Sequence, residues 1–97
     1  MIREREIEAR LVRGVKRLGG ACFKFVSPGC AGVPDRMIIL PGGRVLWVEL
    51  KRSPAEAARP LQLYWLNRLT ELGCEARLIR GKDEVDQLLT ELAGGRA

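Results

Sequence analysis

The 97-residue sequence contains no histidine. This absence excludes Ser–His and Cys–His catalytic pairs, imidazole general bases and zinc sites with histidine ligands. The three cysteines, Cys22, Cys30 and Cys74, are odd in number and fit no zinc-binding pattern. We therefore expect free thiols in a cytoplasmic protein, with each cysteine acting as a small buried hydrophobic side chain.

Long apolar runs are also absent. No run approaches the ~18 residues that a membrane span needs. Residues 3–6 are all charged and alternate in sign, whereas a signal peptide has a basic start followed by an apolar stretch. We therefore expect neither a membrane anchor nor secretion. The length predicts one domain, residues 1–93, followed by a frayed tail at residues 94–97.

Positive charge is in excess. The sequence has 17 Lys and Arg residues against 12 Asp and Glu residues, which gives a net charge of +5. This balance favours a polyanionic partner, with nucleic acid as the leading candidate. The alternative is ordinary solubilising charge.

Two short apolar runs, 37–40 and 45–48, flank the turn residues Pro41-Gly42-Gly43. This pattern predicts two strands joined by a hairpin. Both runs are apolar on both faces, which is typical of strands that are buried on both sides. Asp35 precedes the first strand and Glu49 follows the second. Charged groups at such positions are costly unless they are paired or bind a metal.

The length of the hairpin loop decides where Asp35 points. A three-residue loop pairs Leu40 with Arg44 and thereby places Asp35 opposite Glu49 on the same face. A two-residue loop turns Asp35 away. Glycine suits the left-handed position that a three-residue hairpin requires, so we predict the longer loop, or a bulge that restores the same parity.

Two facing carboxylates would need a cation. At a separation of ~4 Å they repel by ~4 kcal/mol at an effective dielectric constant of 20. The oxygens of Asp35 and Glu49 suit Mg²⁺ or Mn²⁺, either of which reverses the sign of that interaction. Lys51 shares a strand face with Glu49, and its ammonium group is expected to position a water or to stabilise charge on a phosphate.

These residues resemble a known family. Pro34-Asp35 and Glu49-Leu50-Lys51 match the PD-(D/E)XK nuclease signature. The wider pattern is similar to the virus-type replication–repair nuclease domain (VRR-NUC) and spans roughly residues 4–90. It comprises residues 32–36, residues 48–51, Gln62 on the next predicted helix, and Gly73, which ends that helix.

The resemblance implies a metal-dependent, structure-specific DNA endonuclease that hydrolyses phosphodiester bonds in branched or flapped DNA. It further implies Mg²⁺ or Mn²⁺ as cofactor, a phage or DNA-repair context, and a homodimer, because resolving a four-way junction needs two cuts. RNA stays open as a substrate. The alternatives are a non-catalytic nucleic-acid-binding domain, in which Asp35, Glu49 and Lys51 form a structural ion-pair cluster, and a nuclease subunit of a larger replication–repair complex.

The resemblance also assigns roles to single residues. Asp35 and Glu49 would hold the metal, with the backbone carbonyl of Leu50 as a further ligand, and Lys51 would act on the water. A glutamate on the first helix, Glu8 or secondarily Glu4, would add a metal contact.

Other candidates lie around this group. Glu8 lies at the edge of its helix's apolar stripe and is alternatively a solvated residue that pairs with a nearby arginine. Gln62 would orient a water or hold a phosphate, or is a plain surface residue. Ser27, Arg36 and Arg52 are candidates for substrate binding, although a turn-forming role is also open for Ser27.

The predicted fold class is an α/β sandwich of the restriction-endonuclease type, with the order αβββαβα and a mixed four-stranded sheet. The strand at 44–51 should run parallel to the one at 74–80. We expect core stripes on three helices, the last of which is capped by Asp83: Ile7, Leu11, Val15 and Leu18; Leu61, Trp65, Leu69 and Leu72; and Val85, Leu88, Leu89 and Leu92.

Overall fold

The computed structural model describes residues 3–94. Three helices and four strands follow one another in the predicted order, and the α/β fold class is confirmed. The elements are α1 (Glu4–Arg17), β1 (Ala21–Lys24), β2 (Arg36–Leu40), β3 (Arg44–Lys51), α2 (Pro60–Glu71), β4 (Glu75–Arg80) and α3 (Gly81–Gly94).

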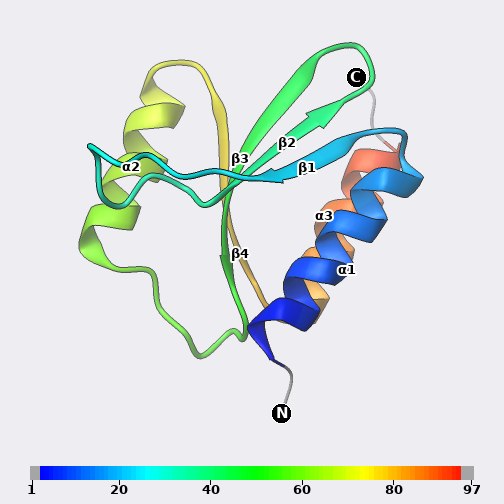
Figure 1. Cartoon of the computed structure of the whole chain (residues 1–97), viewed down its shortest axis with the longest axis horizontal. Coiled ribbons are helices and arrows are strands. Elements are labelled where there is room, and N and C mark those ends of the chain that lie inside the picture. Colours follow the sequence, from blue (N-terminus) through cyan, green and yellow to red (C-terminus); the bar gives the residue numbers. More distant parts are fainter. Residues whose placement is uncertain (1–2, 95–97) are drawn as a thin grey trace.

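The four strands form one mixed sheet in the order β1-β2-β3-β4. Neighbouring strands are antiparallel except β3 and β4, which are parallel as predicted. Helices α1 and α3 pack side by side against one face of the sheet, and α2 stands on the other side (Figure 1). The sheet therefore presents two different faces, one to the helix pair and one to α2.

The hairpin between β2 and β3 has the predicted three-residue loop. Leu40 pairs with Arg44 across residues 41–43. Gly42 and Gly43 have φ angles of 90° and 86°, which side-chain-bearing residues rarely adopt. The parity of the whole hairpin follows from this loop, because side chains alternate between faces along each strand.

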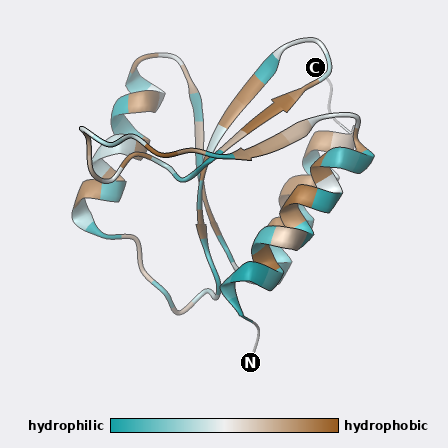
Figure 2. Cartoon of the chain, viewed as in Figure 1, coloured by the Kyte–Doolittle hydropathy of each residue, from teal (hydrophilic) through white to brown (hydrophobic). Residues whose placement is uncertain are grey.

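The hydrophobic core lies between the sheet and the α1–α3 pair. Figure 2 shows apolar strands beside helices whose outer faces are hydrophilic. Helix α1 buries Ile7, Leu11 and Val15, as its spacing predicts. A Cβ atom at Gly14 would lie 2.2 Å from a methyl carbon of Leu89, so the glycine permits the close approach of α3.

Helix α2 faces the sheet with a different side than its apolar spacing predicts. Leu61 and Leu72, expected in the core, are 48% and 59% exposed, whereas Leu66 is 8% exposed. The helix is rotated so that Leu66 is its most buried residue, and Gln62 lies about 40° from Leu66 around the helix axis. The apolar spacing predicted the wrong face of α2 because this helix covers a partly polar face of the sheet. The burial of leucine side chains therefore does not by itself fix the orientation of the helix.

The last helix also differs in detail from the prediction. Helix α3 begins at Gly81, so Asp83 lies inside its first turn and does not cap it. The backbone N–H of Arg80 instead donates to Oε1 of Glu84 at 2.7 Å. The helix ends at Gly94, which was expected in the tail, and residues 95–97 of that tail lie outside the described part of the chain.

Within residues 3–94, no helix combines the length and the apolar composition that a membrane span requires.

Candidate active site

Asp35, Glu49 and Lys51 converge at one end of the β2–β3 hairpin. The last hydrogen-bonded pair of the ladder is Arg36 with Val48, and the same register places Asp35 opposite Glu49. Nζ of Lys51 lies 3.7 Å from Oε2 of Glu49. These three side chains therefore lie together at the end of the hairpin, as the three-residue loop requires.

The site is held in place by the backbone. Oδ1 of Asp35 accepts a hydrogen bond from the N–H of Leu50 at 3.3 Å. On the other side, the backbone carbonyl of Asp35 accepts from the N–H of Phe25 at 2.8 Å. Asp35 is therefore fixed between β3 and the chain that leaves β1, although it lies outside regular strand structure.

Burial raises the pKa values of the two carboxyl groups, Asp35 and Glu49. Glu49 is 4% exposed. Burial first, and the charge of Asp35 second, raise the pKa of Glu49 to about 7, against the opposing effect of Lys51. Burial likewise raises the pKa of Asp35, although the hydrogen bond from Leu50 acts in the opposite direction. The single positive charge of Lys51 therefore does not balance the two negative charges of Asp35 and Glu49.

Gln62 joins this group from α2. Its Nε2 donates to Oε2 of Glu49 at 3.0 Å, while its Oε1 accepts from the backbone N–H of Arg59 at 2.8 Å. The second bond is part of the N-terminal cap of α2, so it fixes which end of the amide faces Glu49. The rotation of α2 carries Gln62 to the sheet, and Gln62 is not a plain surface residue.

The backbone carbonyl of Leu50 is available as an oxygen ligand. In an antiparallel ladder, the N–H and C=O of one residue point toward the same neighbouring strand. The N–H of Leu50 points to Asp35, so its carbonyl lies on the same side. Continuing the register places Pro34 opposite Leu50, and proline has no N–H to donate. The ladder therefore supplies no donor to this carbonyl from position 34.

Glu8 lies close to the site but is paired with an arginine. Its Oε1 is 3.1 Å from Nη2 of Arg36, and Arg36 is buried. The register directs Arg36 to the α1 side of the sheet, away from the face of Glu49. The charge of Glu8 still contributes to the raised pKa of Asp35. Arg36 therefore holds Glu8 beside the site, and its buried position does not favour the predicted contact with substrate.

The predicted substrate-binding residues Ser27 and Arg52 make only local backbone contacts in the described structure. The carbonyl of Ser27 accepts from the N–H of Cys30 at 3.1 Å, which closes a turn. Arg52 is exposed directly after β3, and its backbone N–H donates to Oε1 of Glu56 at 3.1 Å. Neither side chain is drawn into the cluster, and Glu4 is exposed at the start of α1.

Arg80 is a neighbour of the site that the sequence patterns did not single out. It pairs with Lys51 in the parallel β3–β4 ladder. Its Nη2 lies 3.4 Å from Oε2 of Glu84, and its buried Nε has no hydrogen-bond partner among the described residues. The predicted parallel pairing of β3 and β4 could have identified Arg80, because it aligns the last residues of the two strands.

The donor set fits a hard divalent cation. Within residues 3–94, no group of three or more Asp, Glu, Cys or His side chains is arranged to hold a metal. Asp35 and Glu49 supply two carboxylates, and the carbonyl of Leu50 supplies a third oxygen. A cation between the two acids would offset the burial and mutual repulsion that raise both pKa values.

Comparison with known proteins places this chain in a family. No family model matches the chain. This chain is 45% identical over 83 residues to "Putative nuclease p44" of Acyrthosiphon pisum secondary endosymbiont phage 1, and the match covers 86% of this chain and 88% of that protein.

Two solved structures share the fold. A structure described as "VRR_NUC domain" superposes with a TM-score of 0.85 at 28% identity, covering 90% of this chain and 94% of the other. A second, described as "VRR_NUC domain protein", has a TM-score of 0.69 at 22% identity, over 94% of this chain and 88% of the other, and supports the fold alone. The sequence relative and the structural relatives agree, and the chain belongs to the VRR-NUC family of nucleases.

Proposed function

We propose that this nuclease is a metal-dependent, structure-specific DNA endonuclease of the PD-(D/E)XK type. The observation that carries the proposal is the convergence of Asp35, Glu49 and Lys51 at the end of one hairpin, with Gln62 bonded to Glu49. The net charge of +5 suits a polyanionic substrate.

The metal site in this proposal consists of chain oxygens. Asp35, Glu49 and the carbonyl of Leu50 would hold Mg²⁺ or Mn²⁺, with Glu8 beside them. When bound, the cation supplies a Lewis acid that lowers the pKa of water and stabilises negative charge on phosphate oxygens. Because protons compete for Glu49, the residue must be ionised before it can act as a ligand.

The remaining residues orient and compensate charge. The ammonium group of Lys51 is positioned to donate to an attacking water or to a phosphate oxygen, as it is held beside Glu49. Gln62 fixes the orientation of the Glu49 carboxylate through an amide that its own helix cap immobilises. Arg36 pairs with Glu8 on the α1 side of the sheet and so holds Glu8 next to Asp35 without making it part of the Asp35–Glu49 pair. Each polar group thus has a partner that limits its motion.

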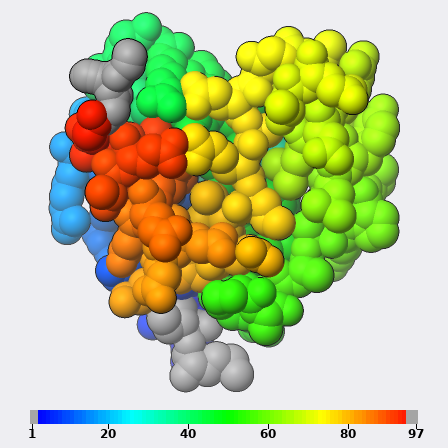
Figure 3. Space-filling model, turned by 180° about the vertical axis from the view of Figure 1, so that it is seen from behind, coloured from blue at the N-terminus to red at the C-terminus, as the bar shows by residue number. Residues whose placement is uncertain are grey.

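We further propose a homodimer acting on branched or flapped DNA. A four-way junction is resolved by two cuts, which one 97-residue chain with one site cannot place symmetrically. Helix α2 forms one flank of the molecule and leaves Leu61, Leu63, Tyr64 and Leu72 exposed (Figure 3). These apolar side chains support pairing of two copies, and the phage origin of the sequence relative supports action in the cytoplasm of an infected bacterium.

The decisive experiment combines metal removal with one substitution. Labelled linear, flapped and four-way DNA are incubated with the protein in Mn²⁺, in Mg²⁺ and in EDTA. We expect cutting of the branched substrates only with metal, and no cutting by Glu49→Gln, which keeps the size of the side chain but removes its charge. Full activity in EDTA, or from Glu49→Gln, would refute the proposal.

A further inference from the structure

Arginine and lysine side chains gather along the seam between α1 and α3. A hollow of about 630 Å³ lies against both helices, and a smaller one of about 140 Å³ adjoins it. The two share Arg10 and Arg13, so they adjoin each other along α1, and together we call them the α1–α3 trough. Its charged lining consists of Arg5, Glu6, Arg10, Arg13, Arg17, Lys82 and Asp86.

Both carboxylates of the trough, Glu6 and Asp86, accept hydrogen bonds from the chain. Asp86 accepts two hydrogen bonds from Arg10, at 2.7 and 2.9 Å, which tie α1 to α3. Oε1 of Glu6 accepts from the backbone N–H of Arg3 at 2.8 Å. The charge of Asp86 is therefore offset by Arg10, whereas Glu6 keeps its negative charge, and cations outnumber acids in the trough.

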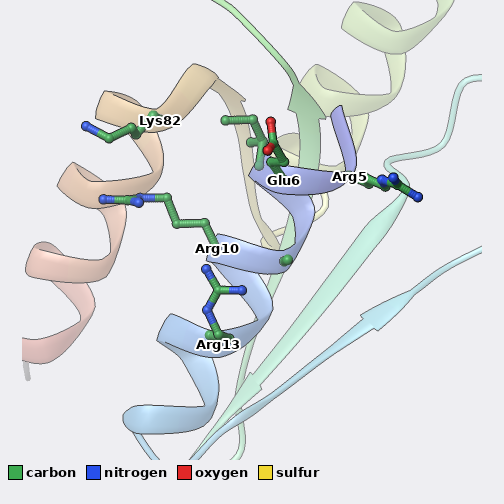
Figure 4. A pocket seen from close by; sticks show the side chains of 7 residues that line it. Arg5, Glu6, Arg10, Arg13 and Lys82 are labelled. Carbon is green, nitrogen blue, oxygen red and sulfur yellow. The ribbon is translucent and has the colours of Figure 1, made fainter. Parts of the chain in front are cut away.

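Several cations of the trough have no such partner. Among residues 3–94, Arg13 and Arg17 have no carboxylate within 4.0 Å. Lys82 lies 3.9 Å from Asp83, whose side chain is 89% exposed. In Figure 4, Arg10 and Arg13 project from α1 on the side where α3 presents Lys82, whereas Arg5 extends past the other side of α1.

The spacing of these cations suits a sugar–phosphate backbone. From Arg13 to Arg17, α1 rises about 6 Å at 1.5 Å per residue, which is about the axial length of two nucleotides in one strand. Guanidinium groups bind phosphate through paired N–H donors. Phosphate contacts of this kind are independent of base sequence.

The trough and the active site lie on different sides of α1. Arg13 and Arg17 are about 140° and 180° from Glu8 around the helix axis. A helix with its side chains is about 10–12 Å thick, so a straight duplex that enters the site at Glu49 cannot also lie in the trough. Only DNA that branches or bends reaches both surfaces.

We propose that the α1–α3 trough binds the phosphate backbone of a second DNA arm, one that is not cut at the adjoining active site. This inference rests on the proposed function and extends it, because it names the surface that favours branched over linear DNA. The contact supplies affinity through charge alone and carries no sequence preference.

The test measures binding without cleavage. Arg13→Gln/Arg17→Gln is compared with its parent in EDTA, on a short linear duplex and on a four-way junction of the same arm sequences. We expect roughly tenfold weaker junction binding, a salt slope reduced by about two, and linear-duplex affinity within about twofold of the parent. Lys82→Gln, on the other helix, should weaken junction binding in the same selective way.

The matched control is Arg68→Gln, which removes one charge from an exposed position on α2. Compared with single Arg13→Gln, it should not discriminate between the junction and the duplex. Equal weakening of both DNAs by the trough variants, or no weakening, would overturn the inference. So would loss of dimers, which would make the trough a contact between copies. Failure of the proposed function is separate, because it appears as cutting by Glu49→Gln while binding is unaffected.

Discussion

Glu49 should make the metal-free protein less stable as the pH rises. Its pKa is about 7 in the folded chain and 4.5 as the ordinary value. A group whose pKa is raised by folding stabilises the folded state below its unfolded pKa, and that contribution is lost as the pH rises through the folded pKa. The window therefore runs from about pH 4.5 to above pH 7. Replacing Glu49 with Gln removes the titration.

The size of the effect follows from the difference of 2.5 pKa units between these two values. At about 1.4 kcal/mol per unit, the free energy of unfolding of the metal-free protein falls by about 3 kcal/mol between pH 4.5 and pH 8. Asp35 adds to the decrease, since burial raises its pKa as well. Glu49→Gln should be more stable than the parent at pH 8 by about this amount and nearly equal at pH 4.5.

The assay is urea denaturation in EDTA at several pH values between 4.5 and 8, with and without the substitution. Ion pairs that lower the pKa of Glu75, Asp86 and Glu91 act below this window, so they do not obscure the trend. Glu71→Gln, at an exposed glutamate, is the control and should leave the pH dependence unchanged. A flat stability profile for the parent, or a Glu49→Gln variant that is less stable at pH 8, would refute the reasoning.

Three further predictions follow from distances and acidity in the structure. Mg²⁺ affinity should fall by about tenfold for each pH unit below 7, because protons compete at Glu49; calorimetry that shows pH-independent binding would contradict this. Gly32→Ala should lower metal-dependent cutting, since its Cβ would lie 2.9 Å from backbone atoms of Leu61 and φ is +91°; kinetics with a parallel melt measure this, and unchanged kinetics would speak against it. Gly14→Val should cost about 1–3 kcal/mol through overpacking against Leu89, with partial rescue by Leu89→Ala in denaturation; no rescue would place the strain elsewhere.

The grouping of Asp35, Glu49 and Lys51 was predictable because it depends on local parity. The turn glycines imply a three-residue loop, and alternation along the strands then brings Asp35 to the face of Glu49 and Lys51. Hydrophobic spacing also identified the buried stripe of α1, since that helix packs against the mainly apolar side of the sheet. Both predictions rest on the side-chain periods of strands and helices, which can be read from a few neighbouring residues.

Helix orientation required the tertiary structure. The apolar spacing of α2 predicted Leu61 and Leu72 in the core, but the helix covers a face that carries the polar site and turns Leu66 and Gln62 toward the sheet instead. The balance between burying leucine and bonding Gln62 to Glu49 depends on the strand beneath, which is distant in sequence.

Long-range charge pairing is the second property that the sequence did not determine. Spacing placed Glu8 at the edge of its helix but did not identify Arg36 as its partner. The basic trough likewise arises only when α1 and α3 come together, because its cations belong to segments separated by most of the chain. The sequence by itself determined the order of the elements, the register of the β2–β3 hairpin and the grouping of Asp35, Glu49 and Lys51, since these follow from local spacing. Packing decided the rest, because ion pairs and hollows depend on which surfaces meet.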